Sequence, residues 1–140
     1  MSSHYVVLLL GSNLGNKKQN LINAIAKIEN KWGKIEKSTE IEETLPLEFV
    51  SKNIFCNIAV ALYTKFSPFS VLKTVKVIEN EMGRTQDSSF SNGYTDRIID
   101  IDIVLYDNIN YESKKLEIPH KKHMFQRDFS KKLLRNLIED

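Results

Sequence analysis

The 140-residue sequence is short of cysteine and of long apolar runs, and each shortage excludes a class of protein. Its single cysteine, Cys56, excludes an intrachain disulfide and fits a reducing compartment. The apolar neighbours of Cys56 favour a buried structural thiol over a nucleophile. No run approaches the ~20 apolar residues of a membrane span, and the start of the chain lacks the basic segment and cleavage site of a secretory leader. We therefore expect a cytoplasmic protein.

An excess of charge of either sign is also lacking. Lys and Arg number 20 and Asp and Glu number 18, which leaves a formal net charge of +2. This balance gives no reason to expect nucleic acid as a partner, although local basic clusters would suit an anionic ligand. The length fits one domain, residues 1–140, that is large enough to bury a sizeable core.

The order of the periodic segments predicts the fold class. Apolar residues at helical spacing, with plausible caps at Asn16 and Ser67, predict helices at 17–31, 68–82 and 129–138. Apolar or β-branched runs predict strands at 5–10, 34–43, 55–64 and 98–106. This order fits a ferredoxin-like α+β sandwich, with a mostly antiparallel sheet. Helices would pack on one face, and loops would close over the other, open face, where the active site is expected.

Residues 97–105 place two carboxylates inside an otherwise apolar run. Successive strand side chains point to opposite faces, so Asp100 and Asp102 share one face. The other face is expected to hold Ile99, Ile101, Ile103 and Leu105. Two neighbouring anions need a compensating cation, and an oxygen-only pair suits Mg²⁺. A strand with one solvated face is the alternative explanation of such a pair.

Basic residues flank the carboxylate pair. Arg84 and Arg97 stand at the two ends of a polar loop, and Arg127 follows His120 by seven residues. A basic fringe is added by Lys114, Lys115, Lys121 and Lys122. Arginines around two carboxylates predict phosphoryl chemistry, in which catalysis is mostly positioning and charge neutralisation.

The three histidines offer a weaker signal. His120 follows a proline and lies beside Lys121 and Lys122, where it could donate to a phosphate. His4 and His123 have no comparable context. The three are too scattered along the chain, and too short of cysteine partners, to predict a zinc site.

Phe55, Asn57 and Phe129 are candidates for holding a flat heteroaromatic ring. Two aromatic side chains would stack on the ring, and the amide would read its edge. Core packing of both phenylalanines is an equally good explanation at this point. The segment 11–15, Gly-Ser-Asn-Leu-Gly, matches neither of the common phosphate-binding fingerprints and is interpreted as a tight turn.

Five motifs together resemble the 6-hydroxymethyl-7,8-dihydropterin pyrophosphokinase family of folate biosynthesis. In chain order they are Gly11-Ser-Asn-Leu14, Phe55-Cys-Asn57, Glu79…Gly83-Arg84, Arg97-x-x-Asp100-x-Asp102 and Pro119-His120…Arg127-x-Phe129. The Arg-x-x-Asp-x-Asp block with Pro-His downstream is the specific part, whereas the first motif alone would be weak. The resemblance covers essentially the whole chain.

The resemblance implies transfer of a pyrophosphoryl group from ATP to the hydroxymethyl oxygen of the pterin, with release of AMP. It implies two Mg²⁺ ions held by Asp100 and Asp102, with Arg84 and Arg97 closing over the phosphates. The ATP site would include Glu79, Ile103, His120, Lys121 and Arg127. The pterin site would include Thr44, Leu47, Phe55, Asn57 and Phe129. The expected partners are ATP and the pterin, and the expected state is a monomer that binds neither nucleic acid nor membrane.

The chain also departs from the family's usual pattern. Residues 94–96, Tyr-Thr-Asp, stand where the family usually has Trp-Gly-Pro. Phe55 replaces a frequent Tyr, and Lys121 replaces an aromatic residue. One extra residue lies between His120 and Arg127, which puts the register of Arg127 in question.

Two functions of other classes compete with this one. An RNA-binding module would use exposed aromatics on central strands and a basic surface, whereas the strand here offers acids that repel a phosphate backbone. A regulatory domain that binds a small molecule without reacting would need no Mg²⁺ and would form no AMP.

Overall fold

A five-stranded antiparallel sheet forms the centre of the molecule. The computed structural model describes residues 3–44, 54–83 and 98–139. The central strand β1 (His4–Ser12) pairs on one side with β4 (Phe55–Thr64) and on the other with β5 (Asp100–Tyr106). The short strands β2 (Lys37–Ser38) and β3 (Glu42–Thr44) both pair with β4. A separate hairpin is formed by β6 (Tyr111–Glu112) and β7 (Glu117–Ile118).

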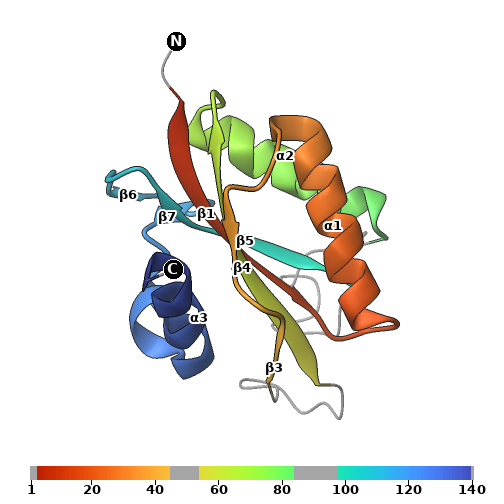
Figure 1. The fold of residues 1–140 in the computed structure, drawn as a ribbon. Helices are drawn as coiled ribbons and strands as arrows, with labels where there is room; N and C mark the ends of the chain where they lie inside the picture. The colour runs from red at the N-terminus through yellow and green to blue at the C-terminus, as the bar shows by residue number, and fades with distance from the viewer. Residues whose placement is uncertain (1–2, 45–53, 84–97, 140) are drawn as a thin grey trace.

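Three α-helices cover the two faces of the sheet. Helices α1 (Lys17–Trp32) and α2 (Pro68–Glu81) lie on one face, and α3 (Asp128–Glu139) lies on the other (Figure 1). Both predicted caps are confirmed, because Asn16 Oδ1 accepts from the Gln19 N–H and Ser67 Oγ accepts from the Ser70 N–H. Among the described residues, no helix combines the length and apolar character needed to cross a membrane.

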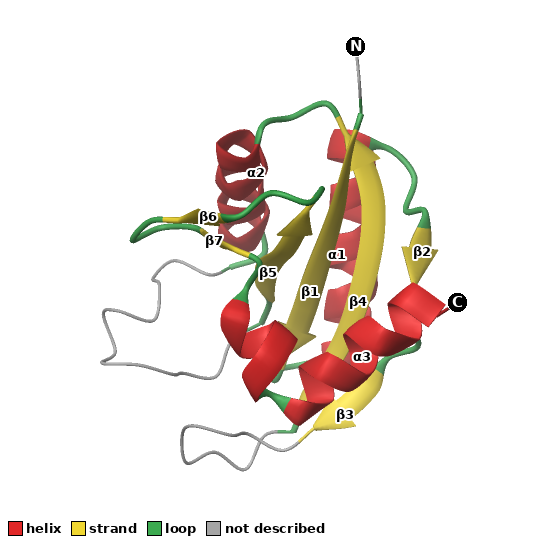
Figure 2. Cartoon of the chain, turned by 90° about the vertical axis from the view of Figure 1, so that its left-hand side faces the viewer, coloured by secondary structure: helices red, strands yellow, loops and turns green. Residues whose placement is uncertain are grey.

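The sheet separates two apolar clusters of side chains. The larger cluster lies between the sheet and helices α1 and α2, and it contains Leu8, Ile58 and the predicted buried thiol of Cys56. The smaller cluster joins residues such as Leu9 to Leu133 of α3. The expectation that the helices pack on one face is therefore confirmed for α1 and α2 and wrong for α3. Figure 2 shows α3 in front of the strands and α1 behind them, so the α3 side of the sheet is open only in part.

A β-bulge changes the side-chain alternation along β5. The pairing with β1 shifts so that Val104 has no opposite residue on β1. Val104 turns into the smaller cluster, and Leu105 packs against the same cluster. The prediction that Leu105 shares a face with the preceding isoleucines is therefore wrong. The prediction is confirmed for Ile99, Ile101 and Ile103, which all lie in the larger cluster.

A buried carboxylate ties α2 to the strand that carries the two aspartates. Glu79 is 1% exposed, and its Oε2 accepts from the Ile101 N–H at 2.8 Å. Lys76 Nζ lies 3.4 Å from Oε1. A hydrogen bond to a charged acceptor is strong, and a buried donor left without it is costly. Glu79 thus anchors β5, and its place beside ATP stays a prediction.

We expect Glu79→Ala to lower the free energy of unfolding by about 2–3 kcal/mol, because the Ile101 N–H loses a charged acceptor. The matched control is Glu81→Ala on the same helix, where the carboxylate is exposed and lies 3.5 Å from Lys27 Nζ. That change should cost no more than about 1 kcal/mol. Urea unfolding of the two variants measures the difference, and equal losses would show that the Glu79 bond does not anchor the strand.

Candidate active site

The strand register lines up polar residues across the α3 side of the sheet. Gly11 of β1 lies opposite Asn57 of β4 and opposite Asp100 of β5. In the next row of this face, Leu9 lies opposite Asp102. Neighbouring strands are about 4.8 Å apart, so the backbones of Asn57 and Asp100 are about 10 Å apart across Gly11. The Asn57 amide and the carboxylates of Asp100 and Asp102 therefore lie on one surface, although Asn57 is far from the two aspartates in sequence.

Gly11, in the middle of this row, has no side chain, and the side chains of Asn57 and Phe55 lie close over it. A Cβ at this position would lie 3.0 Å from Asn57 Oδ1 and 3.6 Å from Phe55 Cδ1. The interpretation of residues 11–15 as a tight turn is wrong at its first residues, because Gly11 and Ser12 still belong to β1. Gly11 is a site residue that sequence reasoning missed. A glycine directly after an apolar strand was the available signal, since it marks close approach of other groups.

Asn57 is held in place by its neighbour on β3. Its side chain is buried, and Nδ2 donates to Thr44 Oγ1 at 2.9 Å. Phe55 lies two residues earlier on the same face of β4, beside Gly11. Three of the five predicted pterin residues are thus brought together. Phe129 lies on α3, with its ring centroid 6.3 Å from that of His123, and Leu47 falls outside the described residues.

Asp102 is held by a chain of two side chains. His123 Nε2 lies 2.7 Å from Asp102 Oδ2, and His123 Nδ1 lies 2.7 Å from Ser130 Oγ. Because the carboxylate can only accept, neutral His123 carries its hydrogen on Nε2, and the Ser130 hydroxyl then donates to Nδ1. Ser130 is 0% exposed, so this serine is not the accessible nucleophile of a hydrolytic triad. The side chains of His123 and Ser130 serve to hold the Asp102 carboxylate.

The charge around Asp102 keeps it ionised. Burial raises the pKa of its carboxyl, but the hydrogen bond from His123, the charges that His123 and His120 carry when protonated, and the charge of Arg127 outweigh this effect and bring the pKa down to about 2. Burial lowers the pKa of His120, and this effect exceeds the opposing effect of the Asp102 charge. The site therefore presents an anionic carboxylate beside a His120 ring whose protonated form is disfavoured by burial.

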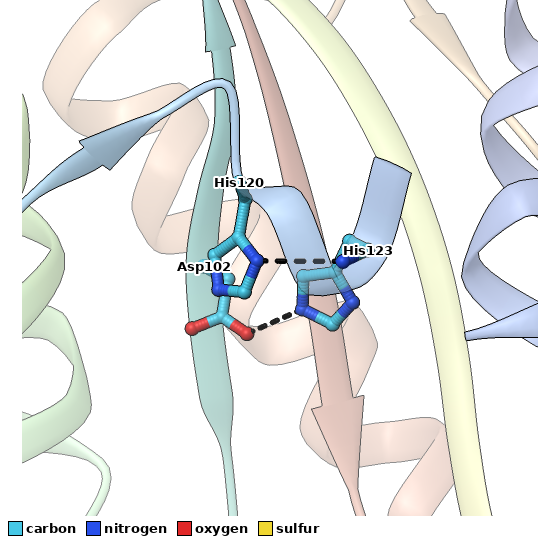
Figure 3. Close-up of side chains that lie close together, drawn as sticks. All are labelled: Asp102, His120 and His123. Atoms are coloured by element: carbon cyan, nitrogen blue, oxygen red, sulfur yellow. Dashed lines mark hydrogen bonds and ion pairs between the residues drawn. The ribbon is translucent and has the colours of Figure 1, made fainter. Parts of the chain in front are cut away.

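A π-helical turn, residues 122–126, carries His123 over the strand (Figure 3). The turn follows His120, whose backbone N–H donates to the carbonyl of the bulge residue Val104 at 2.9 Å. It closes when the Arg127 N–H donates to Lys122 O at 2.9 Å. Such a turn holds one residue more than an α-helical turn. The segment brings Arg127 close enough for its charge to lower the pKa of Asp102, and the extra residue expected between His120 and Arg127 stays a prediction.

His123 lies in the candidate site, contrary to the expectation from its sequence context. The ring of His123 contacts Asp102, and its centroid lies 4.2 Å from that of His120. The three-residue spacing of the two histidines was the available signal, because residues at this spacing share a face once the segment is helical.

The side chains of Ile103 and Lys121 make their contacts outside this cluster. The Ile103 side chain is in the larger apolar cluster, so a contact with nucleotide would have to come from its backbone. Lys121 is exposed, and its Nζ lies 3.4 Å from Glu112 Oε1 on the hairpin. Arg84 and Arg97 fall outside the described residues.

Comparisons with known proteins agree on one family. Residues 7–139 match the family model of 7,8-dihydro-6-hydroxymethylpterin-pyrophosphokinase (HPPK). A 2-amino-4-hydroxy-6-hydroxymethyldihydropteridine pyrophosphokinase of Porphyromonas gingivalis is 40% identical over 125 residues, which cover 89% of this chain and 84% of the relative. A folic acid synthesis protein of Dictyostelium discoideum is 39% identical over 127 residues, which cover 91% of this chain but 18% of that protein. A crystal structure of an HPPK-DHPS in complex with substrates has the same fold, with a TM-score of 0.72 at 17% identity over 99% of this chain and 40% of that one.

The low pKa of Asp102 predicts a loss of stability in acid. The carboxyl titrates near its ordinary value of 3.8 in the unfolded chain and near 2 in the folded protein, so its contribution is present above about pH 4 and is lost as the pH falls toward 2. We expect the free energy of unfolding of the wild type to exceed that of Asp102→Asn by about 2 kcal/mol at about pH 5. Urea unfolding at a series of pH values measures this difference. A difference that stays constant down to about pH 2 would contradict the assignment.

Proposed function

Because the chain belongs to the 7,8-dihydro-6-hydroxymethylpterin-pyrophosphokinase family and is a pyrophosphokinase of folate synthesis, we propose the reaction that it catalyses. It transfers a pyrophosphoryl group from ATP to the hydroxymethyl oxygen of 6-hydroxymethyl-7,8-dihydropterin and releases AMP. Residues 1–140 act as one domain in this reaction. The observation that carries the proposal is the row of Asn57, Gly11 and Asp100, with Asp102 beside it.

Asn57 and Phe55, packed close over Gly11, suit the pterin. An amide offers both a donor and an acceptor to the edge of a heteroaromatic ring, and the bond to Thr44 fixes the orientation of this one. Phe55 would stack on the ring, and Phe129 would approach from the α3 side. A pterin read by Asn57 would then extend its hydroxymethyl group along the row toward the carboxylates.

Asp100 and Asp102 fit Mg²⁺. Both side chains are partly exposed on one face of β5, and Asp102 is ionised, so the pair offers the oxygen ligands that this ion prefers. Bound with ATP, the two ions would neutralise phosphate charge and make the hydroxyl easier to deprotonate. Asp100 and Asp102 would hold them, and the monomeric state expected for the chain is part of this proposal.

The basic residues would hold the triphosphate in line with the hydroxymethyl oxygen. Arg127 supports this role because its charge already acts on Asp102 and His120. The roles of Glu79, Ile103, Lys121, Arg84, Arg97 and Leu47 rest on their motif positions. Since phosphoryl transfer depends mostly on positioning and charge neutralisation, the chain needs no nucleophile of its own.

The decisive experiment mixes purified protein with ATP, Mg²⁺ and 6-hydroxymethyl-7,8-dihydropterin and identifies the nucleotide product. We expect AMP in step with the pterin diphosphate. Asp100→Ala and Asp102→Ala should each lower turnover by about a hundredfold or more, because charge stabilisation at the phosphates is lost. Asp107→Asn, just beyond the end of the same strand, is the control and should retain turnover. ADP as the product, or full turnover in either Asp→Ala variant, would overturn the proposal.

Gly11→Ala tests the pterin site specifically. The added methyl group would press on Asn57 Oδ1, so we expect pterin binding to weaken about tenfold, or about 1.4 kcal/mol, with the affinity for a non-hydrolysable ATP analogue unchanged. Calorimetry measures both affinities. If the methyl group acts through Asn57, then adding Gly11→Ala to an Asn57→Ala variant should lower the pterin affinity little further. Fully additive losses would show that Gly11 acts in another way.

A further inference from the structure

Asp102, His120 and His123 together offer the ligands of a different kind of metal ion. Each residue has one ligand atom within 4.8 Å of the ligand atoms of the other two (Figure 3). In the described parts of the chain, no other group of three histidine, cysteine or acidic residues meets this criterion. Two imidazoles with one carboxylate suit ions such as Zn²⁺, Co²⁺ and Ni²⁺, whereas Mg²⁺ prefers oxygen ligands.

The His123 ring is oriented as a metal ligand would be. Histidines that bind metals usually have the second ring nitrogen hydrogen-bonded to a protein group, which fixes the ring. Here Ser130 Oγ holds Nδ1 at 2.7 Å and thereby directs Nε2 at Asp102. The Ser130 hydroxyl can accept as well as donate. When a metal ion takes the Nε2 lone pair, the hydrogen of the neutral ring moves to Nδ1 and donates to Ser130.

The backbone also fixes the second imidazole. The backbone N–H of His120 donates to Val104 O. The backbone N–H of His123 donates to His120 Nδ1, with 3.4 Å between the two nitrogen atoms. Little further ordering is therefore needed for the three ligands to bind one ion. The nearby charges act in both directions, since the Asp102 and Glu117 carboxylates favour a cation at His120 and the Arg127 guanidinium opposes one.

We propose that Asp102, His120 and His123 bind a transition-metal ion such as Zn²⁺ when no nucleotide occupies the active site. The site shares Asp102 with the proposed Mg²⁺ site, so Zn²⁺ and magnesium-bound ATP compete for the protein. The metal binding itself does not depend on the pyrophosphokinase reaction. A test without ATP and pterin therefore separates failure of this proposal from failure of the proposed function.

The test follows the visible absorption of Co²⁺ added to the full-length, nucleotide-free protein. We expect saturation at one Co²⁺ per chain, displacement by Zn²⁺, and little displacement by excess Mg²⁺, because the ligands include two imidazoles. Ser130→Ala should weaken Co²⁺ binding about 10- to 100-fold, since the His123 ring loses its orienting partner. His120→Ala should weaken binding further, because it removes a ligand.

The matched control is His4→Ala. His4 forms a similar pair with an aspartate, Nδ1 to Asp107 Oδ2 at 2.7 Å, but no third ligand joins this pair from the described residues. We expect this variant to bind Co²⁺ as the wild type does. The proposal is wrong if the wild type binds Co²⁺ no more tightly than His120→Ala does, or if His4→Ala loses as much Co²⁺ affinity as His120→Ala. It is also wrong if Mg²⁺ displaces Co²⁺ readily. Circular dichroism of the metal-free variants establishes that each is folded, and His120→Ala, at a partly exposed residue, provides the test if Ser130→Ala does not fold.

Discussion

The active site depends on the antiparallel pairing of β1 with both of its neighbours. This register places Gly11 between Asn57 and Asp100, and it places Leu9 beside Asp102. A slip of one residue on either side would turn the polar residues toward the buried side of helices α1 and α2. Such a slip is opposed by the apolar residues of β1, which fill both clusters alternately. The same burial that stabilises the sheet therefore aligns the Asn57 amide with the carboxylates.

Helix α3 links the second face of the sheet to the chemistry at Asp102. Leu133 and its neighbours pack α3 on the strands, and Ser130 of the same helix bonds to His123. His123 in turn holds the carboxylate. The β-bulge at Val104 also contributes, because the Val104 carbonyl accepts a hydrogen bond from the backbone N–H of His120. The position of the carboxylate is thus maintained by core packing, by a helix and by an irregular strand at once.

Several patterns that are local in sequence predicted their structures correctly, although the turn expected from Gly11 begins only after β1 ends at Ser12. Alternation placed Asp100 and Asp102 on the face opposite to that of the buried isoleucines. The Asn16 amide caps α1 and the Ser67 hydroxyl caps α2, as expected. Long-range features were predicted less well. Leu105 was assigned to the wrong face because a bulge adds one residue and reverses the alternation. His123 was overlooked because its contact with Asp102 depends on a π-helical turn, and such turns have no strong local sequence pattern.

The amino-acid sequence by itself determined the family, the carboxylate pair and the residues proposed to bind the pterin, because these depend on residue types at short, regular spacings. Only the tertiary structure decided that α3 covers part of the second sheet face, and that the side chains of Asn57 and Phe55 lie close over Gly11. Only the tertiary structure brought two histidines and Asp102 within reach of one ion. These features depend on register and on packing between distant segments, where apolar burial across the whole sheet outweighs local preference.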